Sequence, residues 1–280
     1  MPLTAVRHVR KMRGGAQSHL LEADNGCWYV VKFRNNPQHR RILVNELLSS
    51  VFLGYLKIAV PKTAMIRVTS EFLADNPQLH LNLGTRRVPI EPGWHFGSQF
   101  PGDPNRIAVY DYLPDALLLQ VANLDDFRAI LVFDKWVANA DGRQSIFHRA
   151  RVHRPEDPAP ASRPGFVALM IDNGFAFNGP HWDFPESAVQ GIYHRRMVYE
   201  SVRSLDDFRP WLDQIVHFPE EVIDHAWKRI PPDWIDGEED QLAQLLDRLH
   251  ARRSRLPELI SACRDARTNP FPNWAESTTR

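Results

Sequence analysis

Two apolar stretches of this sequence carry carboxylates at their ends, and they constrain the fold more than any other feature. VFDKWVANADGRQSIF, residues 132–147, contains Asp134 and Asp141, and VALMIDNGFAF, residues 167–177, contains Asp172. Polar residues just beyond a buried segment lie at the rim of a core, where chemistry is usually done. Two such carboxylates could hold a Mg²⁺ ion and orient a hydroxyl group, which is what phosphoryl transfer requires.

The N-terminal part of the sequence reads as β-structure followed by a helix. Residues 19–23 and 27–33 predict two strands joined at Asn25-Gly26, a pair that favours a tight hairpin turn. Lys32 is a cation on an otherwise apolar strand, either snorkelling from an edge or serving a function. Residues 38–56 predict a helix with an apolar stripe. Glu46 borders that stripe, either as a surface residue or as a buried carboxylate with a partner.

The region after this helix changes character twice. Residues 63–68 predict a strand, and residues 69–106, rich in Pro, Gly and Asn, predict a long irregular insertion with one short helix at 71–75. Residues 107–112 predict another strand, after which helical patterns dominate. We therefore expect one domain over residues 1–115 and a helical one over 116–268. Residues 269–280 predict a flexible tail.

The helical half contains a hairpin between the two carboxylate stretches. A helix that begins at Asn123 or Asp125 places Asp134 on its apolar face, where a carboxylate needs a partner. Residues 145–153 and 166–171 predict two strands around an exposed Pro-rich loop at 154–164. Asp141 and Asp172 lie just beyond opposite ends of this hairpin, so strand twist could bring them to one cleft edge. Further helices are predicted at 187–199, 205–214, 219–229, 239–255 and 257–264.

Composition and charge exclude several classes of function. Lys+Arg and Asp+Glu are equal at 34 each, so no overall field favours nucleic acid or an anionic membrane, and we expect no direct nucleic-acid binding. No apolar run approaches the ~18 residues of a membrane span. The two cysteines, Cys27 and Cys263, lack metal-type spacing and favour a reducing, cytoplasmic setting.

The order of these features resembles the protein-kinase-like fold, and most closely the HipA-like kinases and their relatives among the phosphoinositide kinases. The IDNGFAF stretch is very similar to the metal-binding motif of type II phosphoinositide kinases. The resemblance implies an α+β, two-lobed fold, with an antiparallel β N-lobe and a mainly helical C-lobe. It rests on VVKF (30–33), NELL (45–48), AVYDYLPDA (108–116), FDKWVANADGRQ (133–144), IDNGFAF (171–177) and IPPDW (230–234).

The resemblance also implies roles for individual residues. Lys32 would contact the ATP phosphates, and Glu46 would hold it by an ion pair. Asp172 would bind Mg²⁺, and Asp141 would act as the base for the acceptor hydroxyl or orient it. The other nucleotide contacts would come from the glycine turn Gly14, Gly15, Ala16 and Ser18, which would cover the phosphates, and from the adenine hinge Tyr110, Asp111 and Tyr112.

One position departs from the family pattern. These families place a metal-binding Asn five residues after the catalytic Asp, where this chain has Ile146. Either a neighbour such as Gln144 takes its place, or metal binding is impaired. The first reading implies an ATP- and Mg²⁺-dependent kinase for Ser or Thr of a protein, and the second a nucleotide-binding pseudokinase that regulates a partner. A third implied role is regulation through a DNA-binding partner protein, as in some HipA proteins.

Overall fold

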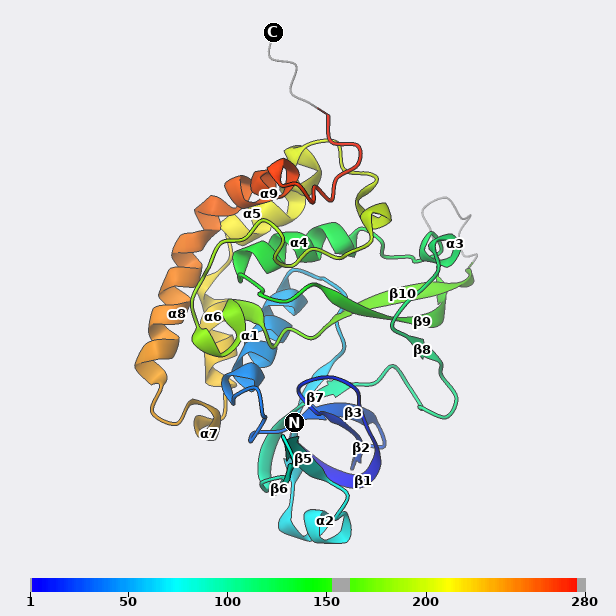
Figure 1. Ribbon diagram of the computed structural model, residues 1–280, viewed down its shortest axis with the longest axis vertical. Helices are drawn as coiled ribbons and strands as arrows, with labels where there is room; N and C mark the ends of the chain where they lie inside the picture. The colour runs from blue at the N-terminus through cyan, green and yellow to red at the C-terminus, as the bar shows by residue number, and fades with distance from the viewer. Residues whose placement is uncertain (1, 153–161, 276–280) are drawn as a thin grey trace.

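The protein is seen in a computed structural model that describes residues 2–152 and 162–275. Figure 1 shows a small β-structure formed by the N-terminal residues and, beside it, a larger part that is mainly helical. Mixed α+β architecture with strands first and helices later is therefore confirmed. No helix within the described ranges is long and apolar enough to cross a membrane.

The N-terminal strands close into a barrel. In spatial order these are β1 (Leu3–Lys11), β2 (His19–Ala23), β3 (Trp28–Lys32), β7 (Gly93–Gln99) and β4 (Thr63–Val68). The turn between β2 and β3 falls at Asn25-Gly26, as predicted, with Gly26 at a φ of 74°. Every neighbouring pair is antiparallel except β1 and β4, which are parallel, so the expected antiparallel sheet is instead a mainly antiparallel barrel.

The prediction of a long irregular insertion over residues 69–106 is wrong, apart from the short helix expected at 71–75. This region contains α2 (Ser70–Asp75), the hairpin β5 (His80–Leu83) and β6 (Arg86–Pro89), and then β7, which pairs with both β3 and β4. The sequence of β7, GWHFGSQ, does not read as a strand because two of its positions are glycines and not apolar residues. A Cβ on Gly97 would lie 2.5 Å from Ile66 Cγ1, so this strand can pack closely only with glycine there.

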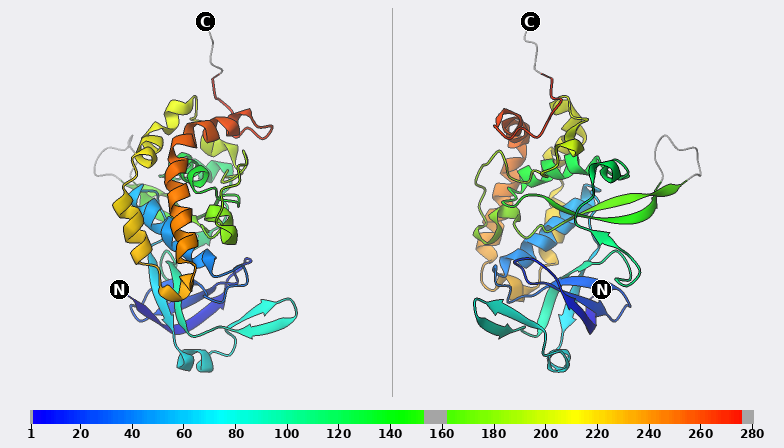
Figure 2. Two further views of the ribbon diagram at one scale, coloured as in Figure 1. Left: turned by 90° about the vertical axis from the view of Figure 1, so that its left-hand side faces the viewer. Right: turned by 45° about the vertical axis from the view of Figure 1, so that its right-hand side comes forward.

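Helix α1 (Arg41–Tyr55) connects the barrel to the helical part. It corresponds to the helix predicted over 38–56, and its apolar residues share one core with the helical part. Figures 1 and 2 show it beside α6 (Glu220–Lys228) and close to α7 (Pro232–Ile235). Because α1 belongs to this shared core, the domain boundary near residue 115 remains a proposal.

The helical part is centred on α4 (Asp126–Trp136), whose residue Trp136 is fully buried and donates a hydrogen bond to the carbonyl of Leu249 at 2.9 Å. The other α-helices described are α3 (Asp115–Leu118), α5 (Arg209–Val216), α8 (Glu239–Arg252) and α9 (Leu256–Asp265). Short 3₁₀ turns are η1 (Ala176–His181), η2 (Arg196–Tyr199), η3 (Leu205–Phe208) and η4 (Arg253–Arg255).

Two segments of the C-terminal part differ from their predictions. A helix over 187–199 is wrong apart from η2, because Gly191 adopts a φ of 70° and its backbone packs so tightly on Asp134 that a Cβ would lie 2.2 Å from Asp134 Cβ. Of the expected flexible tail, residues 269–275 are described. Phe271 is buried there, with its ring centroid 5.6 Å from that of Phe208. The residues 276–280 lie outside the described part.

A long hairpin, β9 (Gln144–Val152) and β10 (Arg163–Ile171), underlies the candidate site, with β8 (Val109–Tyr110) paired to β9. It projects from the body in the right-hand view of Figure 2. The prediction that Asp141 and Asp172 lie beyond opposite ends of this hairpin is wrong, because its register pairs Gln144 with Ile171 and both carboxylates lie beyond the same end. The predicted 154–164 loop falls largely outside the described residues. Pro164 already belongs to β10, which tolerates it because β10 is at the edge of this sheet.

Candidate active site

Three ionisable side chains from distant parts of the chain meet at the boundary between the barrel and the helical part. Lys32 Nζ, at the end of β3, lies 2.5 Å from Glu46 Oε1 of α1 and 2.7 Å from Asp172 Oδ1. Lys32 and Glu46 are almost completely buried, whereas the Asp172 side chain is 35% exposed. The ion pair predicted between Lys32 and Glu46 is present, and the exposed side of the cluster is the Asp172 side.

The charges in this cluster stabilise one another. Burial by itself would lower the pKa of Lys32, but the Glu46 and Asp172 carboxylates outweigh it and raise this pKa above its ordinary value. Burial would likewise raise the pKa of Asp172, but Lys32, and Arg143 more weakly, hold it below its ordinary value. Lys32 and Asp172 are therefore both charged near neutral pH.

Helix α1 supplies a second site residue that sequence reasoning missed. The Asn45 amide lies 2.8 Å from the Gly174 carbonyl and 2.9 Å from that of Ala176, and it also contacts the carbonyl of Gly179. Its oxygen accepts a hydrogen bond from Trp182 Nε1 at 2.8 Å. Asn45 is fully buried, so it ties the loop after Asp172 to α1, one residue before Glu46. The sequence signal that could have identified Asn45 is a polar amide within the mainly apolar run ILVNELL.

The loop after β10 needs its particular residues to bring Asp172 to Lys32. Asp172 adopts a φ of 61°, in the left-handed region that Asp tolerates better than most residues. Gly174 follows so close to α1 that a Cβ would lie 2.6 Å from Ile42 Cγ2. The Asp-Asn-Gly sequence therefore permits a sharp turn that a bulkier triplet would not.

Asp134 orders the loop that precedes β9 and does not reach the Lys32 cluster. Its carboxylate accepts a hydrogen bond from Arg143 Nε at 2.8 Å, a second from the same guanidinium, and one from Asn139 Nδ2 at 3.0 Å. All three side chains are buried. Arg143 also donates to the Ile171 carbonyl at 2.8 Å, so it joins the loop before β9 to the end of β10. The buried role of Arg143 was not predicted, because an arginine after Asp-Gly reads as a surface residue.

Asp141 lies in this ordered loop and is exposed. Its backbone N–H bonds Asn139 Oδ1 at 3.2 Å, and its own Oδ1 accepts the Gly142 N–H at 2.8 Å. Gln144 Nε2 lies 3.4 Å from Asp141 Oδ2. Burial would raise the pKa of Asp172, but a hydrogen bond from Gln144 helps Lys32 and Arg143 to lower it. The Gln144 amide thus connects the two carboxylates that the hairpin brings to one end. On the other side, a Cβ on Gly142 would lie 2.8 Å from His194 Nε2.

The predicted glycine turn lies at the same edge of the barrel as Lys32. The register of β2 and β3 pairs His19 with Val31, so the chain before His19 continues alongside Lys32. Gly14 has a φ of 115°, which favours glycine, and the carbonyl of Ser18 accepts a hydrogen bond from Met12 at 2.8 Å. A Cβ on Gly15 would meet Gln38 Nε2 at 2.8 Å. The turn is therefore placed where it could cover a phosphate chain.

The predicted hinge has other partners. Tyr110 is the last residue of β8 and packs edge-on against Phe166 at a centroid distance of 6.1 Å. Tyr112 is exposed, with the Arg195 guanidinium carbon 4.6 Å from its ring centroid. Asp111 between them is exposed. These residues border the β9–β10 hairpin, and the structure gives no direct contact between them and Lys32 among the described residues.

Ile146 cannot replace a metal-binding Asn because its side chain carries no oxygen or nitrogen atom. Strand β9 begins three residues after Asp141, so Ile146 already lies inside the strand, opposite Leu169 of β10. Side chains alternate along a strand, so Ile146 and Gln144 share a face. Ile146, Leu169 and Ile171 are all partly exposed on this face, whereas Phe147 and Met170 on the other face are buried.

The oxygen atoms at this site suit a hard divalent cation. Among the described residues no three His, Cys, Asp or Glu side chains form a metal cluster. Asp172 and Gln144 offer a carboxylate and an amide oxygen, and Mg²⁺ commonly takes only one or two carboxylates from a protein and the rest from phosphates and water. The residues present therefore fit a cation that shares its coordination with a nucleotide.

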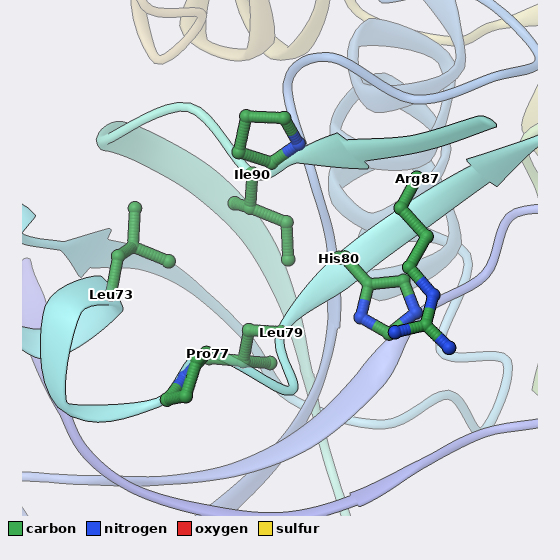
Figure 3. A pocket seen from close by; sticks show the side chains of 7 residues that line it. Leu73, Pro77, Leu79, His80, Arg87 and Ile90 are labelled. Atoms are coloured by element: carbon green, nitrogen blue, oxygen red, sulfur yellow. The ribbon is translucent and has the colours of Figure 1, made fainter.

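Two cavities of the described part lie away from the Lys32 cluster. One of about 270 Å³ lies between α2 and the β5–β6 hairpin, and Figure 3 shows Leu73, His80, Arg87 and Ile90 around it. Another of about 440 Å³ lies where the loop after β3 meets α7. Neither cavity is lined by Lys32, Asp141 or Asp172, so neither is part of the candidate site.

Comparison with known proteins gives a family and a fold. A family model described as HipA-like kinase matches residues 6–152, more than half of the chain. Comparison with curated proteins gives no match. A crystal structure of the Golgi casein kinase is 14% identical, covers 95% of this chain and 74% of its own, and superposes with a TM-score of 0.53. The same kinase with Mn/ADP bound gives 12% identity, the same coverage and a TM-score of 0.50. At this identity the likeness shows the protein-kinase-like fold.

Proposed function

The chain belongs to the HipA-like kinase family, and we propose that it is an ATP- and Mg²⁺-dependent phosphotransferase that acts on the hydroxyl of Ser or Thr in a protein. The observation that carries this proposal is Lys32, held between Glu46 and Asp172 at 2.5 and 2.7 Å. A buried strand lysine with these two partners provides a fixed cation beside a partly exposed carboxylate, which suits a triphosphate.

In the proposed reaction, the acceptor oxygen forms a bond to the γ-phosphorus while the bond from that phosphorus to the β,γ-bridging oxygen breaks, releasing ADP. Asp141 accepts the hydrogen bond of the acceptor hydroxyl and takes its proton. Lys32 neutralises negative charge on the phosphates. A Mg²⁺ ion, when bound at Asp172 and Gln144, would supply further neutralisation of that charge.

The nucleotide would extend from the Lys32 cluster along the hairpin face that carries Ile146 and Leu169. This face is apolar and partly exposed, so it could form the floor beneath the adenine, with Tyr110, Asp111 and Tyr112 at its border. The backbone around Gly14, Gly15 and Ser18 would cover the phosphates from the barrel side.

The experiment is incubation of the protein with [γ-³²P]ATP and Mg²⁺ or Mn²⁺. Autophosphorylation and transfer to cell-lysate proteins are followed by phosphoamino-acid analysis of the labelled product. Label on Ser or Thr of a protein supports the proposal. Label on a lipid or a small molecule would show that the acceptor is of that class and not a protein. The matched control is Asp172→Ala.

The alternative function is a nucleotide-binding pseudokinase, favoured by Ile146 at the position where the family has Asn. It predicts nucleotide binding without transfer in the same assay. Two unpaired cysteines in the described part support a reducing, cytoplasmic setting for either function. Action through a DNA-binding partner stays part of the proposal and is testable only once a partner is isolated.

A further inference from the structure

The loop that joins Lys32 to α1 carries two arginines, α1 begins with a third, and each of the three pairs with a carboxylate from one short segment near the C-terminus. The loop covers residues 33–40, and α1 begins at Arg41. We name the segment 231–238, which includes α7, the C-terminal clamp. Two different lobes thus meet at the residues that separate Lys32 from Glu46.

The ion pairs lie near the two ends of the loop. Arg34 lies 3.1 Å from Asp233, Arg40 pairs with Asp236, and Arg41 Nε lies 2.8 Å from Glu238 Oε2. Arg34 also reaches Glu91, just before β7, at 2.9 Å. Arg34, Arg40 and Arg41 are therefore each matched by a carboxylate of the C-terminal clamp.

The innermost pair is the most buried of these contacts. The Arg41 and Glu238 side chains are 16% and 21% exposed, whereas Asp233 and Asp236 are largely exposed. Burial by itself would raise the pKa of Glu238, but Arg41 and then Arg40 hold it below its ordinary value. Arg41 also donates to the Pro180 carbonyl at 2.7 Å, in the loop that follows Asp172.

An apolar anchor fixes the clamp to the barrel. Trp234 is fully buried, and its Nε1 donates to the carbonyl of Trp94 on β7 at 3.0 Å. The ion pairs around this anchor border the open cavity of about 440 Å³, which is lined by Arg34, Asn35, Arg40, Glu91, Asp233 and Asp236. Because the surrounding charges are open to water, their contribution falls with salt.

We propose that the C-terminal clamp is a positioning element for the Lys32–Glu46 pair: it holds the β3–α1 loop, and with it the start of α1, in the conformation in which Glu46 reaches Lys32. The inference rests on the proposed function for its catalytic consequence only. Glu238 and Asp236 touch neither Lys32 nor Asp172 and act through Arg40 and Arg41.

The test compares Glu238→Gln with Glu239→Gln. Both remove one carboxylate with little change of shape, but Glu239 is an exposed residue at the start of α8. Amide hydrogen exchange of residues 33–46, nucleotide binding and phosphoryl transfer are measured for both variants and for wild type. Glu238→Asp tests rescue, since it keeps the charge.

Glu238→Gln should speed exchange of residues 33–46 and lower kcat for transfer about fivefold, the upper end of what one partly exposed ion pair contributes. Exchange in α8 should not change. In 1 M NaCl, where the Debye length is about 3 Å, the differences in exchange rate and in kcat between Glu238→Gln and wild type should become smaller. Glu239→Gln should match wild type, and Glu238→Asp should recover part of the loss.

Equal exchange of residues 33–46 in wild type and Glu238→Gln would overturn the inference, whatever the activity. If exchange rises but a wild type that transfers phosphate shows the same kcat as Glu238→Gln, the clamp holds the loop without positioning the pair, and the inference also fails. A wild type that transfers no phosphate would refute the proposed function alone, because the exchange experiment still decides the clamp.

Discussion

Lys32 Nζ lies 2.7 Å from Asp172 Oδ1, although 140 residues separate the two in the chain. The contact joins the end of a barrel strand to the turn after a hairpin of the helical part. Neither residue could reach the other without α1, which brings Glu46 to Lys32 and pins the Asp172 loop through Asn45. The site is thus assembled by one helix that contacts both lobes.

Lys32→Met should abolish measurable transfer and weaken ATP binding. The variant keeps the length of the side chain but leaves Glu46 buried without its partner, which costs about 3–5 kcal/mol of stability when the remaining charge is uncompensated. Urea unfolding measures the stability loss, and titration with ATP measures binding on the folded fraction. A Lys32→Met variant with wild-type affinity and transfer would show that Lys32 is not a phosphate ligand.

Acid should remove part of the stability that the Lys32–Asp172 contact provides. The folded pKa of Asp172 is below its ordinary value of 3.8, so its contribution is fully present above pH 3.8 and is lost as the pH falls through the folded value. In Lys32→Met this pKa moves back upward. The difference in unfolding free energy between wild type and Lys32→Met should therefore narrow below about pH 4. A constant difference from pH 7 to pH 2 would contradict the ion pair.

Asn45→Leu should destabilise the protein by about 3 kcal/mol or more, because the buried carbonyls of Gly174 and Ala176 lose a donor and Trp182 Nε1 loses an acceptor. The matched control is Ser50→Ala on the same helix, which removes a partly buried hydroxyl that donates to the Leu47 carbonyl within the helix and lies 3.2 Å from the Thr63 hydroxyl. Thermal unfolding of both variants provides the comparison. Equal effects of the two substitutions would mean that Asn45 does not hold the loop.

Arg143→Met should cost about 3–5 kcal/mol, because it leaves the fully buried Asp134 carboxylate unpaired. The double variant Asp134→Leu, Arg143→Met removes both charges and should recover most of that stability. It should not recover transfer, because Arg143 also holds the end of β10 through the Ile171 carbonyl. Urea unfolding beside a transfer assay separates the two effects. Recovery of both properties would show that the loop needs no ionic support.

The sequence predicted the parts of the site that sit in strongly patterned segments. Lys32 follows a run of β-formers, Glu46 borders an apolar helix stripe, and Asp172 ends an apolar strand, so each stood out against its neighbours. The fold class follows from the order of these segments and the family resemblance that they carry. The hairpin register does not, because the sequence placed Asp141 and Asp172 beyond opposite ends, whereas Gln144 pairs with Ile171 and both carboxylates lie beyond the same end.

The structural features that the sequence did not predict lie in segments without such a clear pattern. Strand β7 was missed because its glycines and His95 break the alternation, although the buried ring of His95 packs edge-on against Phe33. The support of Asp134 by Arg143, and of the Asp172 loop by Asn45, depends on contacts between residues far apart in the chain. Local sequence carries no information on which distant carbonyl or carboxylate a buried polar side chain will meet.

In the proposed reaction, Asp172 binds the metal–nucleotide complex while Asp141 serves the acceptor hydroxyl. The most direct measurement is calorimetric titration of ATP, with and without Mg²⁺, into Asp172→Asn and Asp141→Asn, beside a transfer assay. Asp172→Asn should lose the Mg²⁺-dependent part of nucleotide binding together with transfer. Asp141→Asn should bind Mg²⁺–ATP nearly as wild type does and lower transfer by about 10² or more. The account would be contradicted if Asp141→Asn lost nucleotide binding as Asp172→Asn does, or if Asp172→Asn bound Mg²⁺–ATP and transferred phosphate normally.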